Sequence, residues 1–308
     1  MQQKTLLSAE ISDSYAFKNI LCIIRKEIGE ISIVFSLKEI TIAFINRDNY
    51  AIHEINLDPK NFMSYVYDFE DCPHYSICVK SEELLNATKN IGKRDGIKLS
   101  YLEADNNLIV EPIKCCNVIS TNTTFDNPSK QATKSLVRIV HTENVLDLQK
   151  MPQNYDKYIE VDSKDFSLLC SQACSMNSSF MRISGCSTYI LFEGINAENI
   201  ILVYRRYTAV QKVNLNEEVD EKSAKHIIDA NNGRMVILQD YDLLCENIPS
   251  KTVKTLSKLC NISNNKENKN NPKTNLLFYL SPGAPLRIQS PISNYGIYNI
   301  IIKTPVDV

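Results

Sequence analysis

Ser163-Lys164-Asp165-Phe166 opens a helical pattern in the second half of the chain and matches Ser14-Tyr15-Ala16-Phe17 in the first half. In each half the helix precedes a strand, a short turn and two further strands, and a second helix with more strands follows. The same order of elements in both halves predicts a duplicated domain built from helices and sheets.

The periodicity of apolar residues predicts the individual elements. The predicted helices are 14–29, 81–91, 163–176 and 250–260. The predicted strands are 31–36, 39–46, 50–57, 97–103, 107–114, 180–184, 188–195, 199–207, 234–239, 241–246, 275–281, 286–291 and 297–303. We therefore expect an α+β fold with two topologically similar domains, each with two helices packed on antiparallel sheets.

The length and composition are those of an ordinary globular chain. It has 308 residues and a net charge of −2, and a chain of this length usually exceeds one hydrophobic core. We expect domains at 1–140 and 157–308, joined by a connector at 141–156. No stretch has the roughly 18 uncharged apolar residues of a membrane helix, and the N-terminus has no long apolar segment typical of secretion. Two polar stretches, 115–134 and 261–274, are predicted surface loops.

The ten cysteines do not form a recognisable metal or disulfide pattern. The chain has no CxxC pair, and its four histidines do not complete a zinc site with the usual spacing. We therefore expect reduced, structural thiols in an intracellular protein, with no cofactor and no metal.

No sequence motif argues for an enzyme. The chain contains no P-loop, GxGxxG, HExxH or GxSxG pattern. Asp68, Glu70 and Asp71 form one local acidic run, which is typical of a solvated loop and less often part of a metal-dependent nuclease. We favour the loop, and therefore a protein without catalytic residues.

Basic residues recur on three of the predicted helices. They are Lys18, Arg25 and Lys26 on the first, Lys89 and Lys93 with Arg94 at the end of the second, and Lys251, Lys254 and Lys258 on the fourth. Each group alone is typical of a solvated helix face. Aligned on one surface, the three groups would form a track that binds phosphates without reading sequence.

Three segments resemble the proliferating cell nuclear antigen (PCNA) family of DNA sliding clamps. They are 151–166 (MPQNYDKYIEVDSKDF), 280–288 (LSPGAPLRI) and 297–305. The resemblance covers most of the chain, and 115–134 and 261–274 look like insertions. It implies a ring-forming DNA clamp fold, divergent from the family, and the composition suggests a large DNA virus or a divergent microbe as its source.

The resemblance also implies roles for particular residues. Lys18, Arg25, Lys89, Lys251 and Lys258 match basic positions of the clamp pore, with Lys26, Lys93 and Lys254 beside them; Asn86, Ser171 and Ser175 are neutral at pore positions. The implied partner pocket comprises Ile45, Asn49, Ile52, Val145, Leu146, Leu148, Met151, Pro285 and Ile301. The implied subunit interface comprises Ala132, Lys134, Leu136 and Arg138 on one protomer and Ile200, Leu202 and Tyr204 on the next.

These implications lead to one main interpretation and two alternatives. The main one is a non-catalytic processivity factor that encircles double-stranded DNA as a homotrimer and tethers a DNA polymerase, a clamp loader and repair proteins through short docking peptides. It would act in a nucleus, a cytoplasmic replication site or a viral factory. The alternatives are a subunit of a checkpoint-type clamp and a monomeric or dimeric viral processivity factor of the same fold.

Overall fold

The computed structural model describes most of the chain. The described residues are 4–69, 72–103, 105–114, 134–141, 155, 158–185, 189–208, 244–263, 275–280 and 284–302. We refer to 4–141 as the first half and 158–302 as the second half. None of the described helices is long and apolar enough to cross a lipid bilayer.

The first half contains two helices and nine strands among its described residues. In chain order they are β1 (Thr5–Ile11), α1 (Ser14–Glu27), β2 (Glu30–Ser36), β3 (Ile40–Ile45), β4 (Ala51–Leu57), β5 (Ser64–Tyr67), β6 (His74–Lys80), α2 (Ser81–Ala87), β7 (Gly96–Leu102), β8 (Asn107–Ile113) and β9 (Ser135–His141), with a short 3-10 turn at Pro59–Asn61.

The second half repeats this order. Its described elements are β10 (Tyr158–Asp162), α3 (Ser163–Ser175), β11 (Phe180–Gly185), β12 (Tyr189–Ile195), β13 (Ile201–Thr208), β14 (Leu244–Pro249), α5 (Ser250–Leu256), α6 (Leu259–Ser263), β15 (Asn275–Tyr279), β16 (Arg287–Ile292) and β17 (Gly296–Ile302).

The strands form two antiparallel sheets. One has the order β10-β15-β16-β17-β4-β3-β2-β6-β9-β8-β7-β1-β5, and the other has the order β13-β12-β11-β14. The larger sheet runs through both halves, because β17 of the second half pairs with β4 of the first along seven residue pairs, from Gly296 opposite Leu57 to Ile302 opposite Ala51. We call this pairing, together with the contacts of α5 and α6 with the first half, the closed junction.

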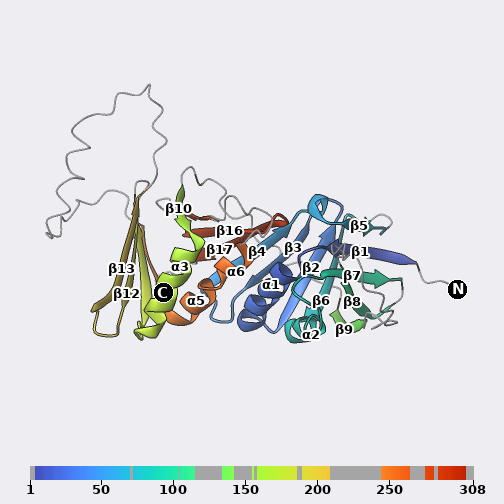
Figure 1. The fold of residues 1–308 in the computed structure, drawn as a ribbon, viewed down its shortest axis with the longest axis horizontal. Coiled ribbons are helices and arrows are strands. Elements are labelled where there is room, and N and C mark those ends of the chain that lie inside the picture. The colour runs from blue at the N-terminus through green and yellow to red at the C-terminus, as the bar shows by residue number, and fades with distance from the viewer. Residues whose placement is uncertain are drawn as a thin grey trace, which may run out of the picture.

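The helices form one layer in front of the sheets (Figure 1). α1 packs against α2 and α6, and α3 packs against α5 and α6, so the order along the molecule is α2, α1, α6, α5, α3. Fully buried aromatic and aliphatic side chains fill the space between helices and strands, with Phe35 and Phe44 in the first half and Phe166 and Phe278 in the second. Their burial holds the helix layer in place.

Local contacts confirm that the two halves repeat one design. Asp13 caps α1 by accepting hydrogen bonds from Tyr15 N and Ala16 N, at 3.0 and 3.2 Å. Asp162 caps α3 in the same way, accepting from the amides two and three residues ahead at 2.9 and 3.0 Å. A carboxylate at this position satisfies amides that have no partner within the helix.

The turn that leads into β4 is also repeated before β13. Asn46 Oδ1 accepts a hydrogen bond from Tyr50 N, and Asn196 Oδ1 accepts one from Ile200 N, both at 2.8 Å. Asn49 and Asn199 both take the left-handed conformation, with φ of 54° and 61°. Asparagine tolerates this conformation better than most residues do, which explains why it recurs at the same place.

Most predicted elements are confirmed, with ends shifted by a few residues, but the predictions for the second and fourth helices are wrong in extent. α2 ends at Ala87 because Thr88 N and its hydroxyl both bond to Leu85 O, at 3.1 and 2.8 Å, and tighten the last turn. The fourth helix is interrupted between α5 and α6, where Ser257 O accepts a hydrogen bond from the Ser167 hydroxyl of α3 at 2.6 Å.

Four strands of the first half, β1, β5, β6 and β9, were not expected from the sequence pattern; of these, only β9 was implied by the resemblance, as a subunit-interface segment. β5 has only four residues and no fully buried side chain, which gives almost no apolar signal. The predicted strand 241–246 is observed as β14, a few residues later. The predicted strand 234–239 lies outside the described residues, as does most of the predicted loops 115–134 and 261–274.

Candidate nucleic-acid interface and docking surfaces

α1 carries three of the predicted phosphate-binding residues, and their surroundings differ. Arg25 and Lys26 in its last turn are exposed, and Arg25 lies 3.8 Å from Glu82 of α2. Lys18 is partly buried and its ammonium donates a hydrogen bond to Ile91 O. Burial lowers the pKa of Lys18, although nearby Asp95 opposes this shift. Lys18 therefore joins α1 to the segment after α2, whereas Lys26 remains open to solvent.

The predicted basic residues of the second helix lie beyond its end. Lys89 and Lys93 are exposed in the turns between α2 and β7. The Lys93 ammonium lies 5.4 Å from the centre of the Tyr15 ring on α1, a cation–π distance. The short helix therefore leaves both lysines in the turns that follow it, with Lys93 beside Tyr15 in the first turn of α1.

Lys258 approaches Lys26 across the boundary between the two halves. Burial and the neighbouring Lys26 together lower the pKa of Lys258 to about 8, and Lys254 adds to the effect. Lys254 itself is exposed on α5. Two ammonium groups at one position repel each other unless an anion lies between them.

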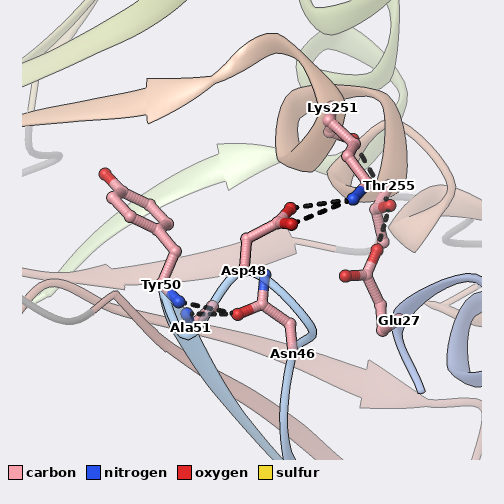
Figure 2. A network of polar contacts seen from close by, with 7 residues as sticks. All are labelled: Glu27, Asn46, Asp48, Tyr50, Ala51, Lys251 and Thr255. Atoms are coloured by element: carbon pink, nitrogen blue, oxygen red, sulfur yellow. Dashed lines mark hydrogen bonds and ion pairs between the residues drawn. The ribbon is translucent and has the colours of Figure 1, made fainter.

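Lys251 has an ion-pair partner within the chain (Figure 2). Its ammonium lies 2.9 and 3.1 Å from the two carboxylate oxygens of Asp48, in the turn between β3 and β4. Close by, the Thr255 hydroxyl donates to the buried Glu27 carboxyl at 2.5 Å. Both contacts join α5 to the first half, so Lys251 contributes to the closed junction in addition to its predicted pore role.

α3 carries one exposed lysine, Lys164 in its first turn, and uncharged side chains at the pore positions expected from the resemblance. The hydroxyls of Ser171 and Ser175 donate to carbonyls of their own helix, Ser167 O and Gln172 O. Leu168 is exposed on the same helix. The two serines are therefore uncharged and exposed, and the cation on the same face of α3 is Lys164, four residues before Leu168.

The predicted subunit-interface residues lie on two sheet edges. β13 pairs only with β12 among the described strands, and Ile201 and Tyr204 on it are 50% and 58% exposed. Of the predicted residues there, Ile200 is exposed and Leu202 is half-buried. An exposed apolar edge of this kind is a template for pairing with another strand.

On the other edge, Leu136 is 64% exposed and Arg138 and Lys134 are exposed. β9 pairs with β8 along four residues, and with β6 only at its end, through Ile139 and His141. The outer edge of residues 135–138 is therefore free of a described strand. Ala132 lies outside the described residues.

Part of the predicted partner pocket forms one row across the sheet. Ile45 lies opposite Ile52, and Ile52 lies opposite Ile301. Ile52 and Ile301 are only 6% and 4% exposed, whereas Asn49 is exposed in the turn beside them. Val145, Leu146, Leu148 and Met151 lie outside the described residues.

An aromatic cluster extends this row and was missed from the sequence. Arg287 lies opposite Ile301, and its guanidinium lies over the rings of Tyr155 and Tyr279, at 5.7 and 5.1 Å from their centres. The Tyr155 hydroxyl donates to Pro285 O at 2.7 Å, which ties the end of the connector to the predicted pocket residue Pro285. Tyrosines spaced irregularly along the sequence give no periodic signal, so only the register of the strands brings them together.

Comparison with known proteins depends on structure. No protein-family model matches the sequence, and no curated protein matches it. Proliferating cellular nuclear antigen from Entamoeba histolytica matches in structure with a TM-score of 0.64, over 97% of this chain and 98% of that chain, at 11% identity. A PCNA2–PCNA3 complex from Sulfolobus tokodaii matches with a TM-score of 0.64, over 96% of this chain and 98% of that chain, at 12% identity.

The chain has the fold of the PCNA clamps. The match spans nearly the whole of both chains, so the α+β clamp fold expected from the sequence is confirmed for the molecule as a whole. At this level of identity the likeness establishes the clamp fold and leaves the roles of individual residues to physical argument.

Proposed function

We propose that this clamp-fold chain is a DNA sliding clamp: a non-catalytic ring around duplex DNA that holds a polymerase and other replication or repair proteins on their template. The observation that carries the proposal is the helix layer. Its cations at α1, at the segment after α2 and at α5–α6 share one layer of a fold that matches PCNA structures end to end. The protein would act where DNA is replicated, in a nucleus, a cytoplasmic replication site or a viral factory.

The DNA contact would be electrostatic and independent of sequence. Lys26 and Lys258 crowd each other at the centre of the layer, and a backbone phosphate between them would relieve their repulsion. Exposed Lys89, Lys93 and Lys254 would add weaker contacts. Binding to phosphates alone positions a protein without fixing its register, which allows it to slide.

The contact between the two halves suggests how one protomer would contact the next in a ring. Within the chain, β4 of the first half pairs with β17 of the second, and α1 packs against α6 behind them. By the repeat of the two halves, β13 of one protomer would pair with β9 of the next, and α3 would meet the next protomer's α2. That arrangement would place Lys89 and Lys93 beside α3 of the neighbouring protomer.

Partners would dock on the row formed by Ile45, Ile52 and Ile301, with Pro285 and the connector at its side. Such a row suits a short helical plug with aromatic anchors. PCNA-family clamps, which this chain resembles, usually have a histidine at the position of Asn49. We expect this difference to change which peptides bind best.

The DNA contact can be tested with matched variants. Lys26→Ala with Lys258→Ala should lower the dependence of log affinity on log salt by about 0.9 for each phosphate that the variant no longer neutralises. Lys38→Ala with Lys60→Ala removes two exposed lysines from outside the helix layer and should leave the salt dependence unchanged. Substituting Lys18, Arg25, Lys89, Lys251 and Lys258 together by alanine should reduce polymerase processivity, and unchanged processivity would contradict the pore assignment.

Encirclement and stoichiometry need a separate measurement. Retention on closed circular DNA, with release when the circle is linearised, is expected for a ring and not for a protein that binds one face. Light scattering should give the mass of a trimer.

Because the described part of α3 has a single lysine, Lys164, a second candidate is a subunit of a heteromeric clamp in which another chain supplies further cations. A stable homotrimer in solution would exclude that candidate, and a stable monomer at micromolar concentration would instead support either a heteromer or a monomeric viral factor.

A further inference from the structure

Three different metal-ligating side chains meet on neighbouring strands at one end of β9. Glu30 begins β2, Cys78 lies in β6, and His141 ends β9. One oxygen of Glu30, the Cys78 sulfur and one ring nitrogen of His141 all lie within 4.8 Å of one another. They are far apart in the sequence and follow no metal-site spacing such as CxxC, so the sequence analysis did not predict them as a group.

The register of the sheet explains the meeting. Cys78 lies opposite His141 of β9 on one side and opposite Ser32 of β2 on the other. Glu30 lies two residues before Ser32, on the same face of β2, so its side chain is diagonal to Cys78 and next to this row. The pairing of β6 with β9 shifts by one residue between Val79, which lies opposite Ile139, and Cys78. This irregularity inserts Val140, so that His141 takes the place beside the thiol. Bulges commonly re-aim a side chain in this way.

The ligand set is one that zinc prefers. A thiolate, an imidazole and a carboxylate bind Zn²⁺ at roughly 2.3, 2.0 and 2.1 Å, with water completing a tetrahedron. Such bonds place ligand atoms roughly 3.3 to 3.7 Å apart. From separations of up to 4.8 Å, reaching these distances needs shifts of up to about 1 Å, which the exposed side chains of Glu30 and His141 can make by changing rotamer.

Without a cation, the surroundings of the thiol disfavour the thiolate form. Cys78 is 3% exposed; burial raises the pKa of its thiol, a hydrogen bond with Ser32 opposes the shift, and the Glu30 charge adds to it. A cation held between the thiol and the carboxylate would reverse both unfavourable effects on the thiolate. Lys80, opposite Glu30 in the sheet, is drawn toward Glu83, 3.6 Å away.

We propose that Glu30, Cys78 and His141 bind one thiophilic divalent cation, with zinc as the expected ion. The site is independent of the proposed clamp function. Its consequence is mechanical: β6 and β9 share only two residue pairs, and a metal bound to both strands and to β2 would fix the end of β9. Residue 141 is also where the predicted connector begins, so the ion would fix its first residue.

The test uses the full-length protein, stripped of metal with a chelator and reduced. Titration with Co²⁺ should give one equivalent of tetrahedral cobalt with a thiolate-to-cobalt charge-transfer band, and Zn²⁺ should displace it. Cys78→Ala should abolish the band. His141→Ala and Glu30→Gln, both at exposed positions, should weaken Zn²⁺ binding at least as much as the ~10–100-fold loss typical of removing an outer-shell partner.

Two matched variants serve as controls. Cys174→Ala removes a half-buried thiol from α3, and His74→Ala removes an exposed imidazole from the other end of β6; neither should alter the cobalt spectrum. Zinc should also raise the melting temperature of the wild type and not of His141→Ala, because a ligand that binds only the folded state stabilises it. Absence of the charge-transfer band, or its persistence in Cys78→Ala, would overturn the proposal.

Discussion

The closed junction and the two free sheet edges involve corresponding strands of the repeated design: β4 corresponds to β13, and β17 corresponds to β9. At the closed junction, β4 pairs with β17, and Ile52 and Ile301 face each other with 6% and 4% exposure. β13, the counterpart of β4, pairs on one side only among the described strands and leaves Tyr204 58% exposed. In the repeated design, β4 therefore has a partner strand on both sides, whereas among the described strands β13 has one on one side only.

In the proposed ring, this difference is what would allow the protomers to assemble. The side chains at the closed junction are specialised, with a buried carboxyl at Glu27 and an ion pair between Asp48 and Lys251. The free edge of β13 carries Ile201 and Tyr204 instead, beside Arg205 and Arg206. The first set of contacts joins the two halves of one chain, and we propose that the second receives a strand of the next protomer.

The largest effect should come from breaking the free edge. Ile201→Asp with Tyr204→Asp places two charges where another strand would pair, and burying them without partners would be strongly unfavourable. We expect a monomer by light scattering and no retention on circular DNA. Ile297→Asp, at an isoleucine of β17 that is 41% exposed, should keep the mass of the wild type; a trimer that survives the double substitution would show that β13 is not the interface.

A smaller effect should come from the closed junction itself. Thr255→Val leaves the buried Glu27 carboxyl without its hydroxyl donor, and an unsatisfied buried polar group costs about 1–3 kcal/mol. Urea unfolding should show this decrease in stability. Lys251→Ala, which removes an exposed ion pair with Asp48, should cost less than about 1 kcal/mol. Equal decreases in the two variants would contradict the distinction between buried and exposed contacts.

A severalfold effect of pH on DNA binding should report on the crowded lysines. Burial and Lys26 lower the pKa of Lys258 to about 8. Below pH 8 Lys258 is already protonated and the affinity should be nearly constant. Above pH 8 binding must take up a proton, so the affinity should fall, by up to about tenfold per pH unit.

The control is Lys26→Ala, which removes part of the repulsion. It raises the pKa of Lys258 and should move the fall in affinity to higher pH, although the overall affinity is lower. A pH profile identical to that of the wild type would show that the two lysines are not coupled. Binding is measured at constant ionic strength, because salt alone changes the affinity.

The smallest effect should distinguish the two copies of the repeated turn. Asn46 is buried and its Oδ1 accepts from Tyr50 N and Ala51 N, whereas Asn196 is less buried. Asn46→Ala should cost about 1–2 kcal/mol, and Asn196→Ala about 0.5 kcal/mol, because water can replace the missing partner where the turn is open. Thermal unfolding of both variants provides the comparison.

Much of the fold was predictable because its signals are local. The alternation of apolar residues places β3, β4 and β12 within about a residue of their observed ends, and the capping aspartates precede two helices whose apolar faces are regular. The failures are also local in origin. α2 and the fourth helix end early where Thr88 and Ser257 find hydrogen bonds that the helical pattern does not show.

The candidate site was predictable in its residue types and less so in its contacts. Lys18, Lys251 and Lys258 were expected to act alike, but the structure gives each a different neighbour: a backbone carbonyl, a carboxylate and a second lysine. These neighbours belong to segments far away in the chain. Their identity depends on which elements pack side by side, and helical spacing holds no information about that.

The sequence by itself determined the duplication, the helix starts, the positions of most strands and the recurrence of cations on three helices, because each is written in neighbouring residues. Tertiary structure alone decided that α1 meets α6, that Lys26 meets Lys258, and that Glu30, Cys78 and His141 meet at the end of β9. The physical reason is register: in a sheet, a shift of one residue changes every neighbour, and that register is fixed only when the whole core packs.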